Sequence, residues 1–380
     1  MSKQIQLRGG SQAENDVFTG VSREITVDTT NNTFRVHDGA TVGGFQVPTQ
    51  SQLALKAPLD SPALVNPTIN GVAQSGYTGF KNHIINGGFD VWQRGTSFTS
   101  NVSDFMADRF TKGRSGQSGA TFSRQTADNA FNYCTRVQRD SGTTSTSQIF
   151  LNQSIESNNS TGLRGKTVTF SAYIRKGADF SGTVTMSIFS GTGIDENLML
   201  VAITGSVTVA TGVKTLTEGW VKYSITGTVP SNSNQVFADF ASSSDGTAGV
   251  NDYYETTGWQ LEEGSVATPF EHRPIGLEFS LCQRYFMHFQ YVGGAQSYAS
   301  SIVFSFPLFR TMRTIPTLTN KASGAGSGAM YSTYGSSAAT TYIAANSATA
   351  SWDGIVTISV SGNVGGVASI SIAGTASAEL

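Results

Sequence analysis

The chemically richest short stretch of the chain is NHIINGGFDVWQRG, residues 82–95, where His83, Asp90, Trp92 and Arg94 surround a Gly-Gly pair. A histidine near a carboxylate could transfer protons, a tryptophan could hold a ligand, and the glycines could simply open a β-domain. Proton transfer needs a positioned set of partners. The histidines of the chain are scattered without metal-ligand spacing, and no serine, histidine and aspartate occur in a nucleophile-elbow context. The segment is therefore interpreted as the start of a strand.

Acidic residues gather at 252–263, where Asp252, Glu255, Glu262 and Glu263 follow one another closely. An enzyme that cleaves a polysaccharide needs two carboxylates across a sugar-sized cleft. In a regular strand Glu255 and Glu263 would share one face and Glu262 would take the other. The sequence also contains no repeat of 20 to 30 residues, which the β-helix of a depolymerase would show. The sequence therefore predicts a protein that is not an enzyme.

Aromatic residues of the distal part of the chain offer a different chemistry. Tyr331, Tyr334, Tyr342 and Trp352 lie among Ser, Thr and Asn with almost no charge. Aromatic faces cover the C–H surface of a sugar, and neighbouring hydroxyl and amide groups bind its hydroxyls. These residues are predicted glycan contacts. For Trp352, a place in the domain core or in a trimer interface is the alternative.

The composition indicates the kind of scaffold that must position these residues. Of 380 residues, 38% are apolar and 13% charged, against averages of about 45–50% and about 25%. Gly, Ser, Thr and Asn fill the deficit, while 23 Phe, 12 Tyr and 4 Trp indicate buried cores. We therefore expect an all-β protein of two or three folding units.

With a net charge of −2, the chain would not be attracted over long range to nucleic acid or to an anionic membrane. No nucleic-acid partner and no membrane insertion are expected. The N-terminus has no apolar signal-peptide core, which predicts synthesis in a cytoplasm. Cys134 and Cys282 lack the spacing of a zinc or redox site and are expected to be buried thiols.

Residues 81–275 consist of short segments that each have one apolar face. VTFSAYI (168–174), TVTMSIF (183–189) and GWVKYSI (219–225) alternate apolar and polar residues, and Gly- and Ser-rich turns separate the segments. The pattern predicts an antiparallel β-sandwich of jelly-roll type. Helical spacing after a proline then predicts a short helix within 274–286, and residues 276–380 are expected to form this helix and a second, smaller β-sandwich.

Residues 1–47 are predicted to form a small β module. EITVD (24–28) and TFRVHDG (33–39) flank the turn residues TTNN, which indicates a β-hairpin. A module of this size has little interior and should pack against copies of itself or a larger partner.

Residues 48–80 carry repeated prolines together with several apolar side chains, which are Leu53, Leu55, Leu59, Leu64, Val65 and Ile69. This composition indicates an extended segment that buries its apolar side chains by self-association. The alternative is a linker that lies on a neighbouring domain of the same chain.

Strict alternation within 89–92 places Phe89 and Val91 on one face and Asp90 and Trp92 on the other. If the Phe89 face is core, Trp92 should lie on a second surface, against the linker, a neighbouring subunit or a ligand.

Several of these segments support a resemblance. LRGGSQAENDVFTGVSREITVDTTNNTFRVHDG (7–39) resembles the N-terminal module of phage tail fibres and tailspikes, including that of the major tropism determinant family. LKAPLDSPALVNPTINGV (55–72) is similar to the proline-punctuated segments of trimeric fibres. NHIINGGFDVWQRG, YIRKG, GWQLEEGSVATPFEHRPIGLEFSLCQRYF, RTMRTIPTLT and the terminal AEL resemble a recurrent phage fibre unit. In that unit a jelly roll similar to carbohydrate-binding modules carries a distal β-domain.

The resemblance implies a homotrimeric tail fibre or receptor-binding protein located on the virion. Its N-terminus would bind a tail or baseplate protein, residues 48–80 would form a trimeric stalk, and its distal β-domains would bind a host surface polysaccharide. A glycan-degrading tailspike and a purely structural tail or baseplate subunit are the alternatives. No cofactor is expected. Carbohydrate-binding modules often hold a structural calcium, for which Asn86, Asp90 and Glu255 would be the oxygen donors.

Overall fold

The computed structural model describes residues 7–48, 68–69, 72–73, 80–99, 102–115, 119–128, 130–293, 301–307, 311–320, 329–334, 339–350, 355–361 and 369–380. Beyond residue 289 it describes side chains only for 311–317 and 375–380. The chain divides into two compact units, 1–76 and 77–380. The predicted stalk lies outside the described residues, apart from the paired strands β5 (Thr68–Ile69) and β6 (Val72–Ala73).

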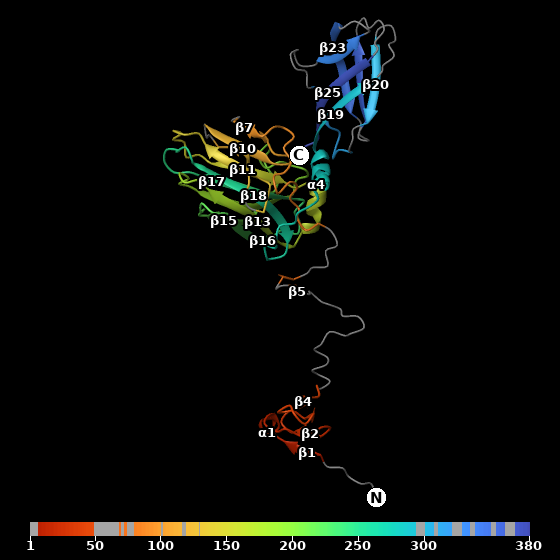
Figure 1. The fold of residues 1–380 in the computed structure, drawn as a ribbon. Coiled ribbons are helices and arrows are strands. Elements are labelled where there is room, and N and C mark those ends of the chain that lie inside the picture. Colours follow the sequence, from red (N-terminus) through yellow and green to blue (C-terminus); the bar gives the residue numbers. More distant parts are fainter. Residues whose placement is uncertain are drawn as a thin grey trace. The chain divides into compact units, whose positions relative to one another are not determined.

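The part of the first unit at residues 7–48 contains a four-stranded sheet and the short helix α1 (Figure 1). Its elements are β1 (Arg8–Gly10), α1 (Gln12–Asp16), β2 (Ile25–Asp28), β3 (Thr33–Val36) and β4 (Phe45–Gln46). The predicted hairpin is confirmed as β2 and β3, which pair in antiparallel register. Asp28 closes its turn, because one carboxylate oxygen accepts hydrogen bonds from the backbone N–H groups of Thr30 and Asn31.

This small sheet buries its polar face. Thr26, Asp28, Thr33 and Arg35 are buried, and Arg35 forms ion pairs with Asp28 and Asp16. The opposite face is apolar and exposed; its exposed residues include Ile25, Phe34, Val36 and Phe45. Residues 7–48 therefore contain no buried apolar core of their own, which is unusual for a folded β-domain.

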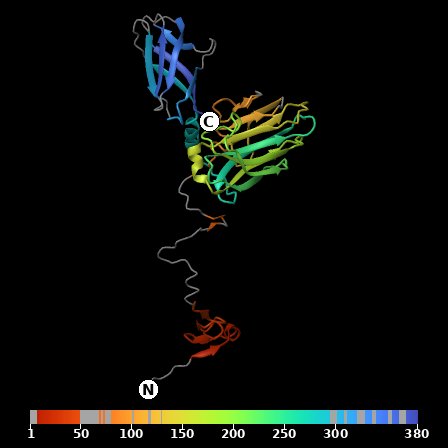
Figure 2. The same cartoon turned by 180° about the vertical axis from the view of Figure 1, so that it is seen from behind.

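Residues 97–263 form a β-sandwich of two six-stranded sheets, and Figures 1 and 2 show its two layers from opposite sides. The first sheet has the order β16 (Val221–Thr228), β13 (Thr167–Lys176), β18 (Tyr253–Glu263), β11 (Tyr133–Arg139), β10 (Ala120–Thr126), β7 (Ser97–Phe98). The second has the order β15 (Val207–Lys214), β14 (Thr183–Gly191), β17 (Gln235–Ser243), β12 (Ile149–Ser154), β9 (Thr111–Arg114), β8 (Asp104–Phe105). The predicted antiparallel sandwich is confirmed.

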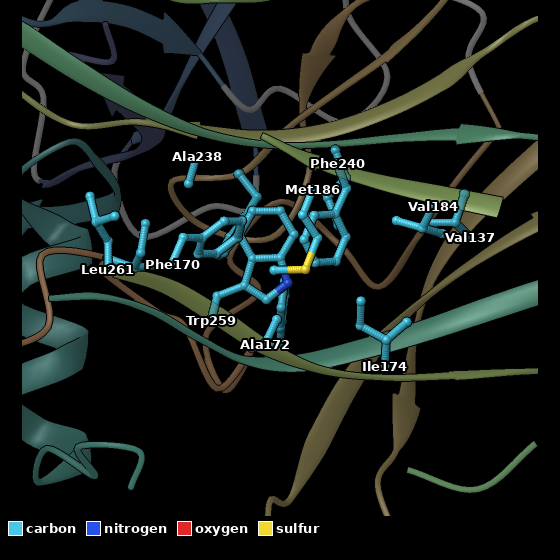
Figure 3. Close-up of a cluster of buried hydrophobic side chains, with 14 of the residues drawn as sticks. Val137, Phe170, Ala172, Ile174, Val184, Met186, Ala238, Phe240, Trp259 and Leu261 are labelled. Carbon is cyan, nitrogen blue, oxygen red and sulfur yellow. The ribbon is translucent and has the colours of Figure 1, made fainter. Parts of the chain in front are cut away.

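The core lies between the two sheets and centres on Trp259 (Figure 3). The ring centroid of Trp259 is 4.2 Å from that of Phe240 in the other sheet and 4.9 Å from that of Phe170 in its own. The predicted inward positions of β13 and β14 are confirmed as fully buried; they are Val168, Phe170, Ala172, Ile174, Val184, Met186 and Ile188. In β16 the prediction holds less well, because Val221 on this edge strand is 37% exposed.

Gly258 makes room for a second cluster on the outer face of the first sheet. Its φ is +65°, and β13 and β18 lose regular register beside it. A Cβ at this position would lie 2.5 Å from a ring atom of Phe131. Only glycine combines this backbone conformation with so close a ring.

The described helical segments of the second unit are α3 (Ser157–Ser160), the 3₁₀ turn Thr161–Leu163, and α4 (Ile275–Gln283). The predicted helix within 274–286 is confirmed as α4. Cys134 and Cys282 are buried free thiols as expected, and burial raises the pKa of Cys134 to about 12. Among the described residues, no helix has the length and apolar character needed to span a membrane.

The distal part contains strands, as predicted, but hydrogen bonds join all seven into one sheet rather than two separate ones. They are β19 (Phe286–Gly293), β20 (Ser301–Pro307), β21 (Thr317–Asn320), β22 (Ala329–Tyr334), β23 (Ala339–Ala350), β24 (Ile355–Ser361) and β25 (Ser369–Ser377). The long strand β23 makes this possible, because its first half pairs with β22 and its second half with β24.

Candidate functional site

Segment 82–95 is not a regular strand, and the predicted alternation of its side chains is wrong. Phe89 and Trp92 belong to the same core, while Val91 packs in a separate cluster with Cys282 of α4. Phe89 has a φ of +56° and Asn86 a φ of +60°, so the backbone turns where the prediction assumed an extended chain. Trp92 is therefore buried in the core instead of facing a ligand, and its indole N–H donates to the carbonyl of Phe89 at 2.6 Å.

The Gly-Gly pair serves close backbone contact with β18. The N–H of Trp259 donates to the carbonyl of Gly87 at 2.9 Å. A Cβ at Gly87 would lie 2.1 Å from the carbonyl oxygen of Trp259, so no other residue fits there. Asn82 donates to that same carbonyl at 3.0 Å. The segment thus adds to the edge of the core as a hydrogen-bonded cap.

The three suggested calcium donors do not form a site. The Asn86 side-chain oxygen accepts from the N–H of Val91, and both Glu255 carboxylate oxygens accept from arginines. Asp90 is half-buried, and burial raises its pKa. Among the described residues, no group of three or more His, Cys, Asp or Glu side chains is placed to hold a metal ion. These residues do not fit a bound calcium.

His83 and Arg94 also separate in space. His83 contacts the carbonyl of Asn159 at 3.2 Å, and burial lowers its pKa. Arg94 pairs with Glu379 near the C-terminus. The residues that gave segment 82–95 its catalytic appearance therefore face different neighbours.

A row of charged side chains crosses the outer face of the first sheet. Arg175, Glu255 and Arg136 are register partners in β13, β18 and β11. Their chain neighbours Tyr254 and Val137 belong to the core, so the row lies on the opposite face. Glu255 is fully buried, and its oxygens accept hydrogen bonds from Arg175 at 2.6 Å and from Arg136 at 2.7 Å. The two guanidinium groups are thus held in fixed orientations.

Half-buried aromatic rings flank both ends of this row. The guanidinium of Arg136 lies 3.8 Å from the ring centroid of Tyr253, and that of Arg175 lies 4.7 Å from that of Trp220. The exposed Asp128 accepts from Arg175 at 2.8 Å and from the Trp220 indole at 2.6 Å. These hydrogen bonds, that from Trp220 first, lower the pKa of Asp128.

A second apolar cluster extends this surface. Phe131, Cys134 and Ala127 are buried on the outer side of the sheet, and the half-buried rings of Tyr173 and Phe270 pack against them. An outer sheet face is ordinarily polar, so aromatic rings there indicate a contact surface. Ring faces beside oriented guanidinium and carboxylate groups can cover the C–H surface of a sugar and bind its hydroxyls. We call Trp220, Arg175, Glu255, Arg136 and Tyr253 the outer-face row.

Sequence reasoning missed the outer-face row, although a signal was present. Tyr173 and Arg175 occupy the polar positions of the alternating segment 168–176, where small hydroxyl residues would suffice. Large aromatic or guanidinium side chains at such positions are candidates for contacts on the outer face. Their partners on β11 and β18 lie 39 and 80 residues from Arg175 in sequence, because Arg136 precedes it and Glu255 follows.

The three distal tyrosines come together in one hairpin. Tyr331 of β22 is the register partner of Tyr342 in β23, and Tyr334 ends β22 opposite Ala339. Trp352 lies outside the described residues. The hairpin groups the predicted distal contacts by backbone pairing alone.

Comparison with known proteins bears on the first unit. Residues 5–41 match the family described as the major tropism determinant N-terminal domain. This segment therefore resembles the N-terminal domain of that family, and for this similarity we call residues 7–48 the tropism-determinant module. The chain is also 62% identical over 45 residues to the "Tail fiber receptor-binding protein" of Bordetella phage BPP-1. That similarity spans 12% of this chain and 12% of the relative, so it does not extend to most of either protein.

The chain also resembles solved structures. One, described as "CBM4 structure and function", covers 47% of this chain and 98% of its own at 19% identity and a TM-score of 0.30. Another is the enzymatically active domain of bacteriophage CBA120 tailspike protein 4, which covers 48% of this chain and 21% of its own at 12% identity and a TM-score of 0.28. At these TM-scores the two likenesses add nothing to the geometry described above.

Proposed function

We propose that this chain is a receptor-binding protein of a phage tail fibre, located on the virion. The tropism-determinant module at residues 5–41 is the observation that carries the proposal. The similarity of that region to a phage tail fibre receptor-binding protein supports the same function. In this proposal residues 1–47 attach the chain to a tail or baseplate protein.

The protein acts as a homotrimer in this proposal, with residues 48–80 as its stalk. The exposed apolar face of the N-terminal sheet (β1–β4) supports self-association, since Phe34 and Phe45 are 51% and 57% exposed in the single chain. Three copies on one fibre would also raise the effective concentration of weak sugar contacts without new contacts.

Residues 81–275 and 276–380 bind a host surface polysaccharide in this proposal. Two surfaces are candidates: the outer-face row of the jelly roll, and the distal hairpin with Tyr331, Tyr334, Tyr342 and Trp352. The outer-face row supports the proposal because Arg136 and Arg175 are already oriented by a buried carboxylate. Prior orientation lowers the entropic cost of binding.

Decoration of bacterial cells by the fluorescently labelled full chain tests the function. The paired variant Trp220→Ala with Tyr253→Ala removes rings of the outer-face row, and Tyr331→Ala with Tyr342→Ala removes rings of the distal hairpin. Phe279→Ala, an exposed aromatic residue of α4, is the matched control. We expect at least one pair to lower decoration about tenfold or more, while the control retains it. A full chain that decorates none of the strains of a broad panel would favour a purely structural tail or baseplate subunit.

Incubation with polysaccharide extracted from a decorated strain separates adhesion from cleavage. We expect no new reducing ends over hours. Release of reducing ends that a carboxylate substitution abolishes would instead establish the glycan-degrading tailspike.

A further inference from the structure

Buried charges concentrate where the last residues of the chain meet the jelly roll. The N-terminal end of β19 pairs with the C-terminal end of β25, with Phe286 opposite Ser377. The N–H of Ala378 then donates to the carbonyl of Tyr285 at 2.7 Å. This pairing carries Glu379 past the end of the distal sheet.

Glu379 lies between two arginines of the jelly roll. Its side chain is 5% exposed, accepts from Arg94 at 2.8 Å and forms a second ion pair with Arg109. Arg109 is itself 2% exposed and also donates to the carbonyl of Ser154 at 2.8 Å. A buried guanidinium without its carboxylate is strongly unfavourable, so Arg109 depends on Glu379.

Aromatic rings at the start of β19 cover these arginines. The guanidinium of Arg94 lies 3.6 Å from the ring centroid of Phe286, and that of Arg109 lies 3.7 Å from that of Tyr285. The Tyr285 hydroxyl donates to Glu156 at 2.7 Å. Both arginines are thus enclosed by the carboxylate on one side and a ring on the other.

Arg313 supplies a second connection. It donates to the carbonyls of Ala378 at 2.9 Å and Glu379 at 3.1 Å, and it pairs with Asp195 of the jelly roll at 2.6 Å. Asp195 is in turn held by Ser157, which donates its N–H at 2.9 Å. Arg313 therefore joins the tail backbone to a loop of the sandwich.

We propose that Arg313, Ala378 and Glu379 form a C-terminal clamp that docks the base of the distal sheet onto the jelly roll, with Glu379 as its positioning residue. The clamp joins segments that sequence inspection singled out separately: 82–95, 258–286, 310–319 and 378–380. It does not rest on the proposed function. If the chain binds host cells, the clamp would hold the two β-domains in one arrangement during binding.

Hydrogen exchange of the full chain, read by mass spectrometry, tests the clamp with Glu379→Gln. We expect amides of 94–109, 284–289 and 376–380 to exchange about tenfold faster, while β13 and β17 keep their protection. The matched control is Glu263→Gln, because Glu263 is 28% exposed and its partner is the exposed Lys166. Unchanged exchange in the three segments of Glu379→Gln would overturn the proposal, as would an equal change in the control.

The single variant Arg94→Gln keeps the test informative if Glu379→Gln unfolds the chain broadly, and a double-mutant cycle of the two substitutions extends the test if Glu379→Gln stays folded. Arg94 is 14% exposed, so a substitution that removes its charge should disturb the fold less than the same substitution at Arg109. We expect Arg94→Gln alone to speed exchange of 376–380 several-fold and to add little once Glu379 is already Gln. Additive effects of the two substitutions would show that the residues do not act together and would overturn the clamp.

Discussion

The tropism-determinant module and the jelly roll use apolar residues in opposite ways. The jelly roll buries Trp259, Phe170 and Phe240 between two sheets. The module buries Asp28 and Arg35 and leaves its apolar sheet face exposed. A β-domain that hides its aromatic residues is complete by itself, whereas one that exposes them is stabilised when another surface covers that face.

The difference separates two sources of stability. The jelly roll has one continuous core of large side chains, so its stability should be intramolecular. The module has hydrogen bonds and ion pairs but little buried apolar area, so association should supply the missing part.

The largest effect is expected in the jelly-roll core. Trp259→Ala should lower the free energy of unfolding by about 3–5 kcal/mol, because the ring contacts both sheets and its removal leaves a cavity. Chemical denaturation measures the loss. Phe34→Ala in the module is the matched substitution and should cost less than about 1 kcal/mol. Equal losses would contradict the contrast.

Asp239 should make the jelly roll less stable as pH rises. Burial raises its pKa from 3.8 to about 8, and in the described residues its carboxyl has no ion pair. Between about pH 4 and pH 8 the folded chain therefore holds a proton that the unfolded chain releases, so stability falls through this window and levels off above it.

Asp239→Asn should remove this slope and raise stability at pH 8 by on the order of 2 kcal/mol. Thermal unfolding at pH 5 and pH 8 measures it. Asp128→Asn is the control. The pKa of the exposed Asp128 is lowered in the folded chain, so the stability that its charged form contributes is lost only at acidic pH. If the stability of Asp239→Asn falls with pH as much as that of the parent chain, Asp239 is not the cause of the pH dependence.

Substitution of the exposed apolar face of the module should change association more than stability. Phe34→Ser with Phe45→Ser should leave the main unfolding transition within about 0.5 kcal/mol. The same pair should shift sedimentation of the full chain toward the monomer, because the face loses its apolar area. Gln12→Ser with Asn31→Ser, two exposed polar residues of the module, is the control. If Phe34→Ser with Phe45→Ser sediments like the parent chain, the exposed face does not mediate association.

Chelation is expected to have the smallest effect. The oxygens of Asn86 and Glu255 already accept hydrogen bonds, so EDTA should leave the melting temperature of the chain unchanged. Calorimetry with and without EDTA measures this. A lower melting temperature that added calcium restores would show that jelly-roll stability also depends on a metal.

The strands and the helix were largely predictable because they follow from local periodicity. In β13 and β14 alternate residues face the core, and a period of two marks them in any extended chain. Helix α4 follows Pro274 with apolar residues at helical spacing. The N-terminal hairpin was equally clear from its turn residues.

The candidate sites were predicted less well because they depend on partners far away in sequence. The resemblance to carbohydrate-binding modules suggests Glu255 as a calcium donor, but two arginines on neighbouring strands form ion pairs with its oxygens. Trp92 was placed by alternation on an outer surface, but positive φ values at Asn86 and Phe89 turn the chain and bring its ring into the core. The grouping of Tyr331 with Tyr342 required the register of β22 and β23.

The sequence by itself determined the mainly β class and the residues of β13 and β14 that face the sandwich core, because these follow from composition and spacing along the chain. Only the tertiary structure decided what segment 82–95 does. Its Gly87 admits the backbone of Trp259, and its Arg94 donates a hydrogen bond to Glu379, 285 residues away. Such contacts depend on how distant strands pack, and no local pattern of residues encodes them.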